Sequence, residues 1–236
     1  MQPASSGSGP EIRPAGRPVS RQVLADHVYE ELLASLMDGR LEPGAAVSID
    51  GTARELDVSP TPVREALARL EHTGMVRRVA LKGYRVAPMF TREDFSELME
   101  ARLAIEPVNA RLACGRLTPG RLAELGQAVA DLKTAPRGPS FAEYRDYLEA
   151  DERFHRLIAE FTGNQFMVAA YGALGGQVQR FRLFGGVGIT DAENAIAEHQ
   201  AVLDAFVSGD PEKASLAMAD HVQKVRGRAI ADAPAG

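Results

Sequence analysis

The chain has 236 residues, of which 45% are hydrophobic and 25% are charged, and its formal net charge is −5 at pH 7. It is too long for one minimal domain and suits two modest ones. No run reaches the 18 apolar residues of a membrane span, and a single cysteine, Cys114, excludes an internal disulfide framework. We therefore expect a cytoplasmic protein with no membrane partner, in which Cys114 is a small buried side chain.

A disordered leader is expected at residues 1–20, because MQPASSGSGPEIRPAGRPVS lacks the apolar stretch of a signal peptide. From 22 to 38, apolar residues recur at helical spacing and the pattern stops at Gly39, which predicts a helix. A turn at LEPG and a short helix that ends at Leu56 follow.

The stretch DVSPTPVREALARLEHTGMV, residues 57–76, predicts a further helix with a stiff first turn. Ser59 fits the N-cap, which places Pro60 at the first helical position, where its missing N–H costs nothing. Pro62 is equally harmless, because the first four N–H groups of a helix have no partner inside it. The apolar stripe of this helix consists of Val63, Leu67 and Leu70.

Two short strands are predicted after Gly74, in MVRRVA and GYRVAPM. Helix, short helix, turn, helix and hairpin is the order of a winged helix-turn-helix, in which the helix after the turn enters the DNA major groove. The charge agrees, since residues 58–88 hold six basic and two acidic side chains, net +4, in an acidic protein. The alternative is a solvated charged face that binds nothing.

From Thr91 onward the sequence predicts almost continuous helix with Gly- and Pro-rich breaks. The six candidate helices cover 91–115, 118–134, 141–162, 165–184, 190–208 and 210–229. The predicted fold class is therefore mainly α. A winged helix-turn-helix with a small β-hairpin wing is expected at 21–88, an all-α bundle of about six helices at 91–230, and a disordered tail at 231–236.

Polar side chains interrupt the apolar stripes of three of these helices. Asp151 and His155 lie in the stripe of the third helix, four residues apart on one face, and His199 and His221 lie in those of the fifth and sixth. Burying these groups is costly unless they are paired or bound. One carboxylate and three imidazoles suit a divalent transition metal, Zn²⁺ in a purified sample or else Ni²⁺, Mn²⁺ or Fe²⁺. The alternative for each residue alone is a hydrogen-bonded core side chain.

Arg102 places a cation in the apolar stripe of the first helix of the bundle. A buried guanidinium needs a planar anion, which a carboxylate matches with two parallel hydrogen bonds. Two interpretations stay open. Arg102 forms a structural salt bridge with Glu106 or with an acid on a neighbouring helix, or it faces the metal and binds the carboxylate of a small organic acid.

Several motifs resemble those of a known family. GRLEPG, LDVSPTPVREALARLEHTGMV and KGYRV resemble the GntR-type winged helix. EARLAIEP, DERFHRLIAEFTGN, EHQAVLDAFVSGD and MADHV resemble its all-helical FCD effector domain, in the FadR-like subfamily. The likeness covers about residues 22–230. The chain departs from the family pattern at Pro60, where many members have Arg, and at Asp57, where Gly is usual.

The resemblance implies a homodimeric transcription regulator, expected to be a repressor. It would bind an inverted-repeat operator in double-stranded DNA and respond to a small carboxylate-containing effector. By the family pattern, Arg102 holds the effector carboxylate, and the metal ligands are Asp151, His155, His199 and His221. The residues expected to contact DNA are Ser59, Thr61, Arg64, Arg69, Arg78, Lys82 and Gly83.

Two other functions stay open. A metal-dependent helical hydrolase with a DNA-binding appendage would use an open metal position to activate water. However, the His-Asp dipeptide of helical metal phosphohydrolases is absent, and the stripes offer no obvious general base, so we do not expect an enzyme. A constitutive DNA-binding dimer with a structural metal would differ from the responsive regulator in showing no ligand-dependent change in DNA affinity.

Overall fold

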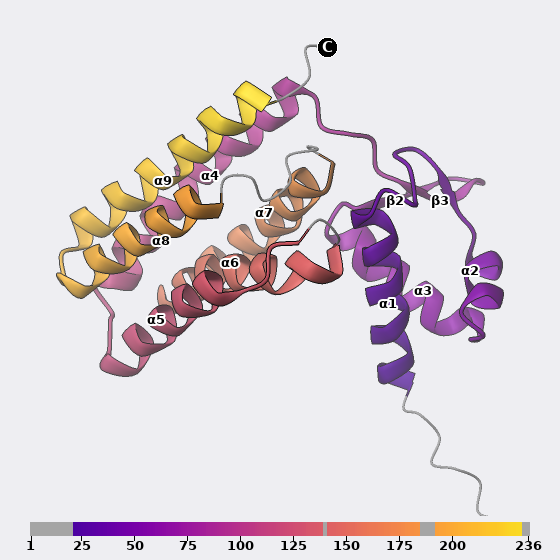
Figure 1. Cartoon of the computed structure of the whole chain (residues 1–236), viewed down its shortest axis with the longest axis horizontal. Coiled ribbons are helices and arrows are strands. Elements are labelled where there is room, and N and C mark those ends of the chain that lie inside the picture. Colours follow the sequence, from indigo (N-terminus) through magenta and orange to yellow (C-terminus); the bar gives the residue numbers. More distant parts are fainter. Residues whose placement is uncertain (1–20, 139–140, 185–191, 233–236) are drawn as a thin grey trace, which may run out of the picture.

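The computed structural model describes residues 21–138, 141–184 and 192–232, so the predicted leader and residues 233–236 of the predicted tail lie outside it. In this part of the chain, nine helices and three short strands form a winged domain at one end of a larger helical bundle (Figure 1). The predicted fold class is confirmed. None of the helices in the described ranges combines the length and apolarity that a membrane crossing requires.

The winged domain contains three helices and a small sheet. The elements are α1 (Arg21–Met37), β1 (Ala46–Val47), α2 (Ile49–Glu55), α3 (Pro60–His72), β2 (Val76–Val79) and β3 (Gly83–Val86). β3 lies between β1 and β2 and pairs antiparallel with both, with Val47 opposite Tyr84 and Arg77 opposite Arg85. The hairpin agrees with the prediction. The sequence does not predict β1, because two residues are too few to show an alternating pattern.

The first turn of α3 is built as the sequence predicts. Ser59 has the extended backbone of an N-cap, although its side chain makes no capping hydrogen bond in the described structure. Pro60 occupies the start of the helix, where the N–H would have no intrahelical partner. Val63 and Leu67 are fully buried in a core shared with α1. The apolar side of α3 is therefore fixed to the domain, which leaves its other side exposed.

Two turns of the winged domain use left-handed backbone at residues other than glycine. Asp57, between α2 and α3, has φ 51°, at the position where the resembling family usually has Gly. Asp adopts this conformation at lower cost than most residues, so the departure is compatible with the fold. Leu81, with φ 61°, lies beside Gly83, with φ 75°, at the exposed tip of the wing.

The bundle consists of α4 (Arg92–Cys114), α5 (Pro119–Thr134), α6 (Phe141–Phe161), α7 (Gln165–Phe184), α8 (Ala192–Val207) and α9 (Pro211–Asp232). α4 lies alongside α9 and also contacts α6 and α7. Arg226 bonds Ser96, and Arg111 pairs with Glu212, so α4 and α9 run antiparallel. Cys114, at the end of α4, is buried as predicted.

Two clusters of buried side chains organise the protein. One fills the bundle and includes Phe154 and Phe206. The other belongs to the winged domain but also takes in Phe141, Tyr147 and Leu148 from the first half of α6. The two halves of the protein are therefore joined by packed apolar surface as well as by the connecting chain.

Candidate metal centre and DNA-binding surface

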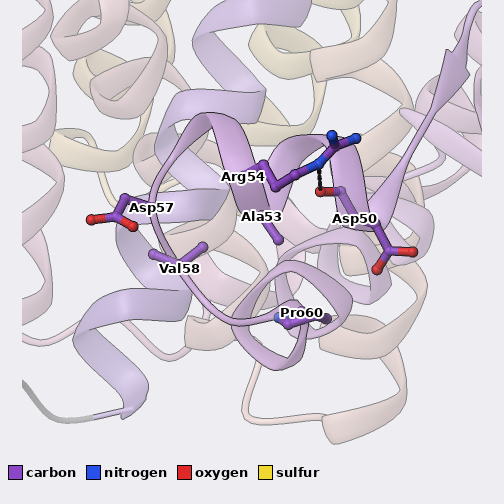
Figure 2. Close-up of a pocket in the computed structure, with 6 residues that line it drawn as sticks. All are labelled: Asp50, Ala53, Arg54, Asp57, Val58 and Pro60. Carbon is purple, nitrogen blue, oxygen red and sulfur yellow. Dashed lines mark hydrogen bonds between the residues drawn. The ribbon is translucent and has the colours of Figure 1, made fainter.

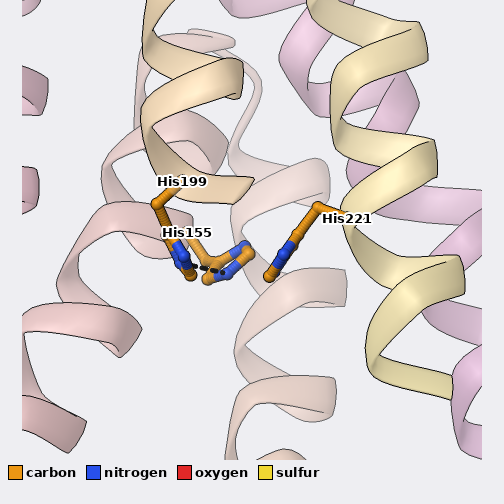
Figure 3. Close-up of side chains that lie close together, drawn as sticks. All are labelled: His155, His199 and His221. Carbon is orange, nitrogen blue, oxygen red and sulfur yellow. Dashed lines mark hydrogen bonds between the residues drawn. The ribbon is translucent and has the colours of Figure 1, made fainter. Parts of the chain in front are cut away.

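Three histidines from three helices meet inside the bundle. His155 on α6, His199 on α8 and His221 on α9 point toward one another (Figure 3). One nitrogen of each ring lies within 4.8 Å of the others, and all three residues are buried. The structure thus brings together the histidines that interrupt the apolar stripes of three separate helices.

Each of these rings has an oxygen atom beside its Nδ1 atom, in hydrogen-bond geometry at His199 and His221 and as a close ion-pair contact at His155. The contacts are His155 Nδ1 to Glu106 Oε2 at 2.8 Å, His199 Nδ1 to the Ala195 carbonyl oxygen at 2.7 Å, and His221 Nδ1 to Glu198 Oε2 at 2.9 Å. A carbonyl or an ionised carboxylate accepts and cannot donate, so Nδ1 carries the proton in each neutral ring. Each Nε2 is then left with a lone pair.

Two of these lone pairs lie close together, and the third belongs to a buried atom. His155 Nε2 and His199 Nε2 are 3.2 Å apart, the dashed contact in Figure 3. His221 Nε2 is buried and has no hydrogen-bond partner among the described residues. Donor atoms at the usual Zn–N distance of about 2.0–2.1 Å lie roughly 3.0–3.4 Å from each other. The 3.2 Å separation therefore suits a cation shared between the rings.

Asp151 adds a carboxylate at the same place. Its Oδ1 lies 3.4 Å from His199 Nε2, and the residue is 3% exposed. Burial lowers the pKa of His221 well below its ordinary value, and any protonation of His199 or His155, together with the charge of Arg102, lowers it further. This favours the neutral ring that a metal ligand requires. The donor set of one carboxylate and three imidazoles fits a divalent transition metal.

Arg102 and Glu106 form a buried salt bridge beside the histidines. Arg102 Nε lies 2.5 Å from Glu106 Oε1, its Nη2 lies 3.3 Å from Oε2, and both residues are 2% exposed. Burial alone would raise the pKa of Glu106, but Arg102 and His155 lower it more, so the pKa falls well below its usual range. Of the two interpretations of Arg102, the structure shows the salt bridge. Glu106 links Arg102 to His155.

We expect Arg102→Ala to destabilise the protein strongly, because the buried negative charge of Glu106 then loses its positively charged partner. Breaking a buried ion pair in this way costs about 3–5 kcal/mol. The matched control is Arg156→Ala, which removes a pair of the same i,i+4 spacing, with Glu160, from a more exposed part of α6. Such surface pairs contribute about 0.3–0.5 kcal/mol. Urea denaturation measures both losses, and small, equal losses would contradict the burial argument.

Glu198 was not among the predicted site residues. It is buried, holds His221 Nδ1, and accepts two hydrogen bonds from Arg228 at 2.6 and 3.0 Å. Glu198 directly precedes His199 in the sequence, but its contact with His221 depends on how α8 packs against α9. Residue spacing within one helix cannot reveal such a contact.

Tyr171 on α7 was also missed. Its ring stacks on His155 with the centroids 6.5 Å apart, and its hydroxyl donates to Glu152 Oε2 at 3.0 Å. Burial raises the pKa of Tyr171 well above its ordinary value, and the charges of Glu152 and Glu106 raise it further. Tyr171 therefore stays neutral and lies against the ring of His155.

The predicted DNA-contacting residues lie on α3 and the wing. All seven are exposed, namely Ser59, Thr61, Arg64, Arg69, Arg78, Lys82 and Gly83. Arg69 has a second role, because its guanidinium bonds Asp26 at 2.6 Å and lies 4.1 Å from the centre of the Tyr29 ring. Arg69 thus links α3 to α1. A count of basic residues along the chain does not indicate this interaction.

A surface hollow of about 370 Å³ lies beside the turn between α2 and α3 (Figure 2). Its lining residues are Asp50, Ala53, Arg54, Asp57, Val58 and Pro60. Arg54 is turned back onto its own helix, where its Nε donates to the Asp50 carbonyl oxygen at 3.2 Å. Two carboxylates make this lining unsuitable for a phosphate, so we assign no ligand to it.

Comparisons with known proteins identify both halves of the chain. Residues 97–224, more than half of the chain, match the FCD domain, and residues 24–86 match the family described as bacterial regulatory proteins, gntR family. The chain is 29% identical to the Probable D-xylose utilization operon transcriptional repressor of Paenarthrobacter nicotinovorans, over 86% of this chain and 88% of that protein. It is 28% identical to the HTH-type transcriptional repressor NanR of Cronobacter sakazakii, over 89% of this chain and 86% of that protein.

Solved structures share the fold. McbR/YncC of E. coli superposes with a TM-score of 0.69 at 23% identity, over 87% of this chain and 96% of that chain. A GntR-type regulator from Rhodococcus sp. RHA1 gives a TM-score of 0.64 at 20% identity, over 88% of this chain and 97% of that chain. Because both halves are matched in the same order, the chain belongs to the GntR family of bacterial transcriptional regulators, with an FCD domain as its helical half.

Proposed function

We propose that this protein is a transcriptional repressor whose affinity for DNA is changed by a small organic acid bound at a metal in the helical domain. The observation that carries this proposal is the arrangement of His155, His199 and His221. Each Nδ1 atom lies beside an oxygen atom, and one ring nitrogen of each histidine lies within 4.8 Å of the others. Bringing three imidazoles and the Asp151 carboxylate together in a buried place is costly unless they share a cation.

The proposed metal ligands are Asp151, His155, His199 and His221. A divalent metal bound by these side chains would offer an electrophilic position for a carboxylate oxygen of the effector. Glu106 and Glu198 orient the rings of His155 and His221, and acceptors in such positions also strengthen the ligands.

An effector would not meet an empty guanidinium at Arg102. Its guanidinium is already bound by Glu106, so a carboxylate near Arg102 has to share it with, or displace, that side chain. We therefore keep Arg102 as a proposed effector-binding residue and expect its effect on the response to be combined with the loss of stability described above.

A thermal-shift screen of small carboxylates tests this function. The relative named for D-xylose utilisation suggests starting with sugar-derived acids. We expect one class of acid to raise the melting temperature of metal-loaded protein and to lose this effect after treatment with a chelator. A protein that binds metal and DNA, yet responds to none of the acids, would instead be a constitutive DNA-binding dimer with a structural metal.

We expect Glu198→Gln to weaken metal binding by about 10–100-fold, the usual effect of disturbing a group that orients a metal ligand. The amide cannot bind Arg228 as the carboxylate does, and it holds His221 less firmly. Glu193→Gln, on the exposed side of the same helix, is the matched control. Competition with a fluorescent zinc chelator measures both affinities. Equal affinities would show that Glu198 does not position the ligand.

The winged domain is the proposed DNA-binding part. Its exposed α3 residues and wing tip would contact a short inverted repeat in double-stranded DNA, with two copies of the chain related by two-fold symmetry. One short recognition helix contacts too few bases to select a site alone, which is the reason for expecting a homodimer. A monomer in light scattering at micromolar concentration, with one chain still bound per site, would contradict this arrangement.

A further inference from the structure

Helix α7 contains Gly172, Gly175 and Gly176, although glycine in the interior of a helix is less favourable than alanine. A Cβ atom at Gly176 would lie only 2.8 Å from the Cα atom of Thr73, in the winged domain. A Cβ atom at Gly175 would lie 2.9 Å from Glu152 Oε1. Gly172 has no such neighbour within 4 Å among the described residues. The neighbour of Gly175 is the end of a flexible side chain, whereas that of Gly176 is backbone, so close contact requires glycine only at Gly176.

Gly176 touches the end of α3, the helix expected to enter the DNA groove. Thr73 is the C-cap of α3, and its Oγ1 donates to the Leu70 carbonyl oxygen at 3.0 Å. The next residue, Gly74, has φ 74°, and the side chain of Gln177 packs against it. The backbone of α7 is thus in direct contact with the chain where α3 ends.

The same helix also touches the histidine cluster. Tyr171, between one and two turns before Gly176 on α7, stacks on His155 and donates to Glu152, the residue that follows Asp151. α7 therefore connects the proposed metal ligands to the C-terminal end of α3.

Helix α6 supports the winged domain at a second point. Arg145 pairs with Glu30 of α1 at 2.8 Å, and the backbone N–H of Phe141 donates to Asp38 Oδ1 at 2.9 Å. Figure 1 shows α1 beside the ends of α6 and α7. With supports on two helices, a change in the angle between α6 and α7 alters how the winged domain is held.

We propose that α7 transmits the state of the histidine cluster to the DNA-binding domain through the contact of Gly176 with Thr73. Drawing His155 toward His199 and His221 fixes the ring on which Tyr171 stacks, and this fixes α7 where it supports α3. The inference rests on the proposed metal site, and it adds the route by which that site reaches α3.

Hydrogen exchange of the full chain, with zinc alone as the probe, tests this route without requiring the operator or the effector. In the wild type, zinc should slow exchange in peptides around His155 and also in a peptide that spans 67–79. Coupled sites commonly differ by 5-fold or more, so we expect roughly that slowing in the second peptide. Gly176→Ala should keep the first effect and lose the second, while Gly172→Ala should keep both.

Gln177→Ala provides a second variant in case Gly176→Ala does not fold. It trims the side chain that packs on Gly74 without introducing a clash, and it should reduce the zinc effect on 67–79. If zinc slows exchange around His155 but not at 67–79, or if both variants behave like Gly172→Ala, α7 is not the route. If zinc slows exchange in neither region of the wild type, the proposed metal site is wrong, and the proposed route through α7 is wrong as well.

Discussion

His199→Ala should weaken metal binding by at least about 100-fold and remove the zinc-dependent part of the thermal stability. The Nε2 atom of His199 lies 3.2 Å from that of His155 and 3.4 Å from Asp151 Oδ1, so its ring is central to the donor set. Disturbing a group that only orients a ligand already costs about 10–100-fold, and deleting a ligand should cost more. A metal present at about 100 times its Kd stabilises the folded state by roughly 2.7 kcal/mol, which the variant should lose.

Metal content by mass spectrometry and melting curves with and without a chelator measure this loss. The control is His27→Ala, because His27 is exposed on α1 and distant in sequence from the cluster. The response to an effector acid should disappear together with the metal, while basal DNA binding persists. A His199→Ala protein that binds stoichiometric metal and responds to the same acid would place the site elsewhere.

Arg64→Ala should reduce operator affinity by at least roughly 100-fold while leaving the melting temperature unchanged. Arg64 is exposed just behind the first turn of α3, and the core-facing residues of that helix are not altered. A good base contact by an arginine contributes about 1–3 kcal/mol. Since a two-fold dimer loses this contact twice, the effects combine.

An operator selected from random duplexes allows this loss to be measured by fluorescence anisotropy. Arg116→Ala removes the same charge from an exposed site in the bundle, so it controls for the change in net charge. Arg78→Ala, on β2 of the wing, should weaken binding modestly and lower the salt dependence by about one unit, as expected for a single phosphate contact. Unchanged operator affinity in Arg64→Ala would show that α3 is not the DNA-contacting helix.

The sequence alone determined the order and type of the long elements. The stiff first turn of α3 follows from Ser59 and Pro60, which act on backbone groups within one turn. The histidines could be selected because a helix of 3.6 residues per turn exposes its inward face as a repeating pattern, and His155, His199 and His221 break that pattern. These features are local, so they require no knowledge of how helices pack.

Tertiary structure decided what those side chains contact. The contact of Glu106 with His155, and the role of Glu198 at His221, depend on the packing of α4 against α6 and of α8 against α9. The pairing of Glu106 with Arg102 is different, because both lie four residues apart on α4 and the sequence already offered it. Arg69 counts as a basic residue in the sequence, but its contact with Asp26 appears only when α3 packs on α1. Gly176 likewise reads as a poor helix residue until the backbone of another domain lies 2.8 Å from its missing Cβ. Distances between helices are set by the whole core, and no periodic pattern within one helix encodes them.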